Sequence, residues 1–62
     1  MNPSFSPFAQ EILQDAEHVV QSGEERKIRE EIDRVNREFS AQELCESEHT
    51  LILEVLQEAL GE

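Results

Sequence analysis

Apolar side chains recur every three or four residues along most of the chain, a spacing that places them on one face of an α-helix. No stretch of the sequence shows the apolar-polar alternation of a half-buried strand. Breaks at Ser22-Gly23 and near Ser40 divide the pattern into three segments. The 62 residues therefore predict a single all-α domain, a small three-helix domain spanning residues 1–62.

The first segment carries signals for both ends of a helix. Ser6 can cap the helix start, with Pro7 at the first helical position, and Gly23 suits the left-handed conformation that ends a helix. We expect helix 1 over about residues 7–21, preceded by a flexible arm at residues 1–5. A tight reversal at Gly23 would make helices 1 and 2 an antiparallel hairpin.

The second segment is charged, with one narrow apolar line, and we expect helix 2 over about residues 24–39. Ser40-Ala41-Gln42-Glu43 then matches a capping box, and Phe39 and Leu44 could form the hydrophobic staple that accompanies one. We therefore expect helix 3 over about residues 41–60. The alternative is a two-helix hairpin whose long second helix runs through Ser40 and dimerises into a four-helix bundle. Either fold buries the apolar line of helix 2 and part of helix 3, namely Ile28, Ile32, Val35, Phe39, Leu44, Leu51 and Val55.

Helix 3 has more apolar surface than one groove between two slim helices can cover, because its apolar arc spans about 200°. The arc divides into a first stripe, Leu44, Leu51, Ile52, Val55 and Ala59, and a second stripe, Leu53, Leu56 and Leu60. We expect the second stripe to bind a partner or a second copy of the chain. The alternative is that the second stripe fills the monomer core.

Three further residues are candidates for the interface. Phe5 and Phe8 are two of only three aromatic residues, and aromatic side chains often anchor interfaces, although a short arm could instead pack back on its own bundle. Glu48 is the one acid inside the first apolar stripe. Since burying an unpaired charge is costly, either the apolar arc is open at Glu48, a rim position early in the helix, or an arginine meets it.

The charge balance narrows the classes of partner. The formal net charge is −10, and its division is −3 for residues 1–23, −1 for residues 24–40 and −6 for residues 41–62. All five bases fall in the middle segment. An acidic surface repels phosphate, so we expect no direct nucleic-acid or anionic-membrane binding. The sequence also has no apolar run long enough for a bilayer and no signal-peptide pattern, and we expect a cytoplasmic protein.

Few residues could carry chemistry. Asp15-x-x-His18 and Glu46-x-x-His49 resemble the motifs of di-iron bundles, but His18 and Glu46 would point away from the apolar arcs of their helices. A structural zinc site needs four ligands, and the chain has one cysteine and two histidines. The sequence also has no phosphate-binding glycine loop and no nucleophile arrangement. We therefore expect no enzyme activity, no metal and no cofactor.

Two functions remain. The first is a small acidic protein-interaction module (a regulator, adaptor, chaperone-like escort or minor subunit) that docks an apolar helix face on a partner or on itself as a homodimer. The second is an antagonist that mimics nucleic acid, with carboxylates such as Glu43, Glu46, Glu54 and Glu58 in the place of phosphates. Leucines matter most in the first case, and carboxylates in the second.

Overall fold

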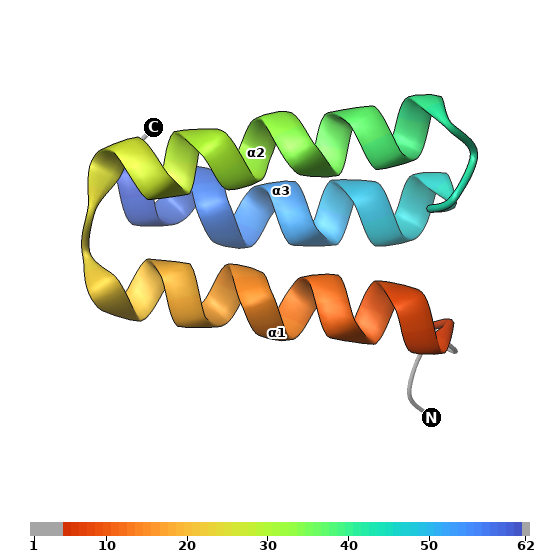
Figure 1. Cartoon of the computed structure of the whole chain (residues 1–62), viewed down its shortest axis with the longest axis horizontal. Coiled ribbons are helices and arrows are strands. Elements are labelled where there is room, and N and C mark those ends of the chain that lie inside the picture. The colour runs from red at the N-terminus through yellow and green to blue at the C-terminus, as the bar shows by residue number, and fades with distance from the viewer. Residues whose placement is uncertain (1–4, 62) are drawn as a thin grey trace.

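The fold is a three-helix bundle, described for residues 5–61 by a computed structural model. Helix α1 spans Pro7–Ser22, α2 spans Glu25–Ser40 and α3 spans Glu46–Leu60. The chain runs along α1, returns along α2 and runs back along α3, and each helix packs against the other two (Figure 1). The all-α, three-helix prediction is therefore confirmed. The predicted arm lies outside the described residues except for Phe5, which is half-buried.

Both ends of α1 form as the sequence predicts. The Ser6 hydroxyl accepts a hydrogen bond from the Ala9 backbone N–H at 3.1 Å, and Pro7 occupies the first helical position. Gly23 ends the helix with φ +72°, and its N–H donates to the Val20 carbonyl. Glycine populates this left-handed conformation without the steric cost that a Cβ brings. The chain therefore reverses tightly into α2, which makes the expected hairpin.

The end of α2 differs from the prediction. Ser40 is the last residue of α2, so it caps no following helix. Gln42 adopts the left-handed conformation with φ +65°, while the Glu43 N–H donates to the Glu38 carbonyl and the Gln42 N–H donates to the Phe39 carbonyl. These two bonds are those of a Schellman motif, which terminates a helix by satisfying its last carbonyls. The predicted capping box at Ser40 is therefore wrong, and so is a third helix that begins at residue 41.

Helix α3 begins at Glu46, five residues later than predicted, with Cys45 as its N-cap. The Glu48 carboxylate accepts a hydrogen bond from the Cys45 N–H at 2.9 Å, which is one half of a capping box. The Cys45 thiol takes the place that serine or threonine usually fills in the other half. Helices α2 and α3 are thus separate, and the alternative of one long second helix is wrong.

The core is narrow and runs along the axis of the bundle. Its members come from all three helices and from the α2–α3 connection, and they are Ala9, Ile12, Ala16, Ile28, Val35, Leu44, Ile52 and Leu56. Ile32 and Val55 are only partly buried, while Phe39 is 36% exposed and Leu51 is 39% exposed. The predicted burial of Phe39 and Leu51 is therefore wrong. Leu51 lies on a flank of α3, because the middle of the apolar arc, at Ile52, faces the core; Phe39 lies in the last turn of α2.

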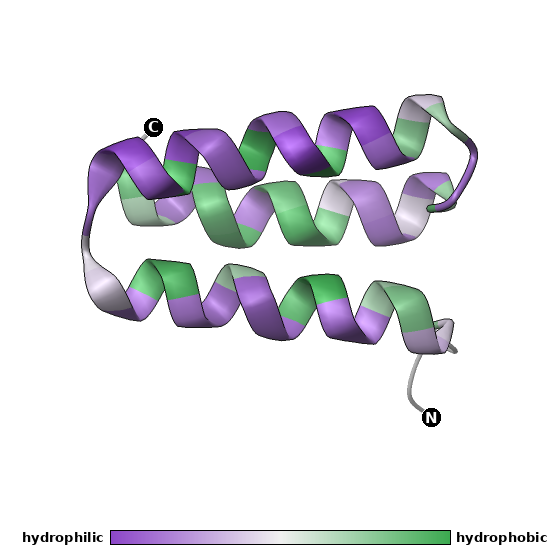
Figure 2. Ribbon diagram, viewed as in Figure 1, coloured by the Kyte–Doolittle hydropathy of each residue, from purple (hydrophilic) through white to green (hydrophobic). Residues whose placement is uncertain are grey.

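Hydropathy is divided unequally among the helices. Helix α2 is largely hydrophilic on the side seen in Figure 2, whereas α3 has long hydrophobic stretches in the same view. Within residues 5–61, no helix has the length and apolar character that crossing a bilayer requires. In the view of Figure 2 the hydrophobic residues are more abundant on α3 than on α2.

Candidate functional site

The face that α3 turns to the core is centred on Glu48, Ile52 and Leu56. These residues are four apart, so they form one line along the helix, and they are exposed by 6%, 0% and 0% respectively. Leu56, predicted as an interface residue, is therefore a core residue that offers no surface in the single chain. Its substitution would test the stability of the bundle and not a contact with a partner.

The other two leucines of the predicted second stripe flank this central line. Leu53 and Leu60 are half-buried and pack against the core. They lie four and eleven residues after His49, on the same face of α3, and His49 contacts α2 through Asn36. Both leucines therefore lie on the α2 side of α3 and are largely covered by the bundle, as in the alternative that the second stripe fills the core.

The two N-terminal phenylalanines also pack inward. Phe5 and Phe8 are half-buried against the core cluster. The Gln10 side-chain amide donates to the Phe5 carbonyl at 3.2 Å, which ties residue 5 to the first turn of α1. This arrangement corresponds to the alternative in which the segment packs back on its own bundle. A role of these phenylalanines in binding a partner stays a prediction.

Glu48 joins the starts of two helices. One carboxylate oxygen accepts the Cys45 N–H at 2.9 Å, and the other accepts the Ser6 N–H at 3.0 Å, 42 residues away in sequence. Cys45 and Ser6 are the N-caps of α3 and α1, where the helix dipole is positive. The prediction that an arginine meets a buried Glu48 is therefore wrong: backbone N–H groups at two helix N-termini bind the carboxylate instead. We call Glu48 with these two N–H groups the N-terminal clasp.

The clasp changes the acidity of Glu48. Hydrogen bonds from the Cys45 and Ser6 backbones lower the pKa of Glu48 below its ordinary value of 4.5, against the opposing effect of desolvation. The carboxylate is therefore ionised in the folded protein at neutral pH although its residue is buried. This role of Glu48 could not be predicted from the sequence, because Ser6 and Glu48 are 42 residues apart and meet only through the packing of α1 against α3. The Cys45-x-x-Glu48 spacing was the one local signal for half of it.

A second buried acid lies between α1 and α2. Glu31 is 8% exposed, and its Oε2 lies 3.6 Å from the Arg34 guanidinium but has no hydrogen-bond partner. Arg34 reaches across to Asp15 of α1 at 3.1 Å. Desolvation raises the pKa of Glu31, Arg34 opposes that rise, and Asp15 adds to it. These side chains link the two helices, and their partners explain them as a structural ion-pair network.

An exposed aromatic pair marks the α2 side of α3. The rings of Phe39 and His49 are stacked with centroids 4.0 Å apart and planes 7° apart. The His49 Nε2 also lies 2.7 Å from the Asn36 Oδ1. Both contacts join α2 to α3, and Phe39 stays 36% exposed beside them.

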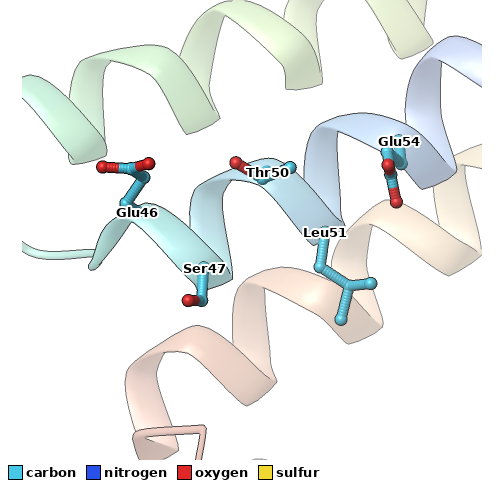
Figure 3. A pocket seen from close by; sticks show the side chains of 5 residues that line it. All are labelled: Glu46, Ser47, Thr50, Leu51 and Glu54. Carbon is cyan, nitrogen blue, oxygen red and sulfur yellow. The ribbon is translucent and has the colours of Figure 1, made fainter.

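The opposite flank of α3, which faces α1, carries apolar side chains that the bundle leaves partly uncovered. Leu51, Val55 and Ala59 are four residues apart and form a row, and Val20 of α1 lines a surface hollow with Val55 and Ala59. Leu13 lies seven residues before Val20, on the same face of α1, and is half-buried. In Figure 3 the Leu51 side chain extends from α3 toward α1. We call these five residues the α1/α3 seam.

Carboxylates border the seam. Glu54 and Glu58 follow Leu51 and Val55 by three residues, which places them beside the apolar row, and Glu17 lies between Leu13 and Val20 in sequence. Glu54 belongs to the same open depression as Leu51 (Figure 3), and Glu58 belongs to the hollow lined by Val55. No lysine or arginine occurs in the sequence of α1 or α3. The seam is thus an apolar strip with an acidic border.

The described part of the chain does not contain a group of three or more histidine, cysteine, aspartate or glutamate side chains placed to share a metal ion. Comparisons of the chain with protein-family models, with curated proteins and with solved structures find no match. The candidate site of this bundle is the α1/α3 seam, where partly exposed apolar side chains lie beside carboxylates.

Proposed function

We propose that this protein is a protein-interaction module that docks through the α1/α3 seam. The observation that carries the proposal is Leu51, which is 39% exposed on an acidic surface while smaller residues such as Ala9 and Ala16 are fully buried. A leucine side chain gains about 1.5–3 kcal/mol when it is moved from water into an apolar environment. A partner that covers Leu51 and its neighbours would recover a part of that free energy.

The remainder of the bundle offers less for such a contact. On the α2 side of α3, His49 stacks on the Phe39 ring and leaves 36% of that residue exposed, while Leu53 and Leu60 are half-buried. Residues two apart on a helix point in nearly opposite directions, so Leu51 and His49 lie on opposite flanks of α3. The flank toward α2 thus presents one aromatic ring that already has a stacking partner, whereas the flank toward α1 presents a row of aliphatic side chains beside carboxylates.

The test compares the wild-type chain with Leu51→Ser and with Phe39→Ser as a matched control at similar exposure. Each tagged chain captures proteins from an extract of the source cells, and the captured proteins are identified, purified and titrated directly. We expect Leu51→Ser to weaken a direct interaction by about tenfold and Phe39→Ser to change it by less than threefold. If the purified partners bind all three chains alike, or if no protein binds, the proposal is wrong.

A second candidate is a mimic of nucleic acid, which the absence of bases from the sequences of α1 and α3 favours. In that case the carboxylates would contact a basic cleft, and the leucines would matter little. Glu43→Gln, at a carboxylate that lines neither of the two depressions beside the seam, would then weaken binding more than Leu51→Ser does. The same titrations therefore distinguish the two candidates.

A further inference from the structure

We infer that the occupant of the α1/α3 seam is an amphipathic helix with a basic border, supplied by a different protein. This inference deepens the proposed function and depends on it. Such a helix would bury apolar side chains against Leu51, Val55 and Val20, and its lysines or arginines would lie beside Glu17, Glu54 and Glu58. The bundle would thereby gain a fourth helix.

The geometry suits a helix. Helices α1 and α3 run in the same direction on adjacent sides of the bundle (Figure 1), and their facing flanks form a strip along their common length. In the apolar row of α3, Ala59 follows Leu51 by eight residues, so at about 1.5 Å per residue the row is roughly 12 Å long. About two to three turns of a partner helix would lie along it. The spacing of Leu51, Val55 and Ala59 at every fourth residue is the ridge pattern that helices use to pack on one another.

The negative charge of α1 and α3 favours a partner helix that carries lysine or arginine. Helix α1 contains three acids and α3 contains four, and neither contains a lysine or an arginine. A helix with lysine or arginine beside its apolar line would find carboxylates on both sides of the seam. An acidic helix would meet repulsion along its whole length, and a neutral one would gain only the apolar contact.

The same charges argue against a second copy of this chain as the occupant. Two seams placed face to face would oppose carboxylates to carboxylates. Helix α2 carries all five bases, but Lys27, Arg29 and Arg37 form ion pairs with acids of α2 or of its N-cap. Arg34 is paired with Asp15 and Glu31. Four of the five bases of α2 thus already lie beside an acid of their own chain, three of them in exposed pairs that contribute little free energy.

The test uses two synthetic peptides of about 18 residues that share one line of leucines at helical spacing. One peptide has lysines beside that line, and the other has glutamates at the same positions. Calorimetric titration of the full chain is carried out at about 0.05 M and about 0.3 M salt. We expect the lysine peptide to bind at least tenfold more tightly than the glutamate peptide, and its affinity to fall with added salt.

Titrating variants of the chain with the lysine peptide shows which residues contact the peptide. Leu51→Ser should weaken binding of the lysine peptide about tenfold, whereas Phe39→Ser should leave it within threefold. The double variant Glu54→Gln/Glu58→Gln should weaken binding at low salt and reduce its salt dependence. Glu11→Gln/Glu30→Gln removes the same charge away from the seam and should have the smaller effect. Helical circular dichroism of each variant confirms that the bundle has folded.

Several outcomes would overturn the inference. Equal binding of both peptides, no binding of either, or binding that Leu51→Ser leaves unchanged would show that a basic helix is not the occupant. Light scattering that finds a dimer dissociated by Leu51→Ser would identify a second copy instead. If a natural partner still depends on Leu51 in these cases, the proposed function stands and only the inference fails. If no partner depends on Leu51, both fail.

Discussion

Replacing Glu48 with glutamine should destabilise the bundle more than its small change in shape suggests. The carboxylate accepts one backbone N–H from each of two helix starts, at 2.9 and 3.0 Å. A glutamine amide has one oxygen, so it can accept only one of these bonds, and its NH₂ group would face the other N–H. Hydrogen bonds to a charged group contribute about 1.5–3 kcal/mol, and the helix dipoles add about 0.3–1 kcal/mol.

We therefore expect Glu48→Gln to lower the free energy of unfolding by about 2 kcal/mol at pH 7. At 0.05–0.15 kcal/mol per residue, a chain of 62 residues has a total of roughly 3–9 kcal/mol, so this is a large part of it. The midpoint of thermal unfolding should fall by about 10 °C. Urea and thermal unfolding followed by circular dichroism measure both quantities. Glu54→Gln, an exposed change on the same helix, should stay within about 0.5 kcal/mol.

The effect should also depend on pH in a definite direction. Because the clasp lowers the pKa of Glu48, the unfolded chain takes up a proton at higher pH than the folded chain. The stabilisation is complete above the ordinary value of 4.5 and is lost as pH falls through the lower folded-state pKa. The difference between wild type and Glu48→Gln should therefore shrink below about pH 4.5. A difference under about 0.5 kcal/mol at pH 7, or one that stays constant down to pH 3, would refute the clasp.

Three further substitutions test other parts of the fold. Glu31→Gln should be neutral or stabilising by up to about 1 kcal/mol at pH 7, since Glu31 is desolvated and its Oε2 has no hydrogen bond. Because the pKa of Glu31 is raised in the folded protein, the wild-type chain becomes more stable as pH falls toward 4.5, so the difference from Glu31→Gln should shrink. If Glu31→Gln lowered the free energy of unfolding by more than about 1 kcal/mol at pH 7, this account of Glu31 would be wrong. Leu56→Ala should cost about 2–5 kcal/mol in urea unfolding and Leu51→Ala less than about 1 kcal/mol, and equal costs would mean that their burial is misassigned. Gln42→Gly should raise stability by about 1 kcal/mol by relieving the positive φ, and a lowered thermal midpoint would count against the Schellman turn.

The sequence predicted α1 well and the start of α3 poorly, and the difference lies in the chemistry of the helix ends. Ser6, Pro7 and Gly23 each have a strong preference for the position that they occupy. At the α2–α3 connection the left-handed position is filled by Gln42 and the N-cap by Cys45, and neither residue type is a usual signal there. Ser40-x-x-Glu43 matches the usual residues of a capping box better than Cys45-x-x-Glu48 does, so the sequence predicts the start of helix 3 too early.

Two separate errors concern α3: its first residue and the side of the helix that is buried. The first error did not cause the second, because a later start leaves the angles between residues around the helix axis unchanged. The prediction placed the buried face on the first stripe, with Leu51 and Val55, and treated Glu48 as an exception within it. In the structure Glu48 lies on the central line with Ile52 and Leu56, because the starts of α1 and α3 supply the donors that its carboxylate needs. A buried acid at the third position of a helix can thus mark the core-facing side.

The sequence predicts that α3 has more apolar surface than the bundle buries, but not which side of α3 stays exposed. The sequence favours Leu53, Leu56 and Leu60 as the exposed leucines, whereas Leu51 is the large apolar side chain of α3 that is most exposed. Because α2 packs on one flank of α3, that flank is covered by Asn36 and Phe39, and the exposed apolar surface lies toward α1. Only the packing of the three helices could decide between the flanks.

An exposed leucine and several carboxylates lie on the same face of the bundle. Helices α1 and α3 contain seven acids and no lysine or arginine, and of these acids Asp15 pairs with Arg34 and Glu48 is bound by two backbone N–H groups. Like charges held together in the folded state lower its stability by mutual repulsion. A basic helix in the seam would reduce that repulsion in addition to burying apolar surface. The free energy of unfolding and the affinity for such a ligand should therefore respond to salt in opposite directions: added salt stabilises the free bundle and weakens the complex.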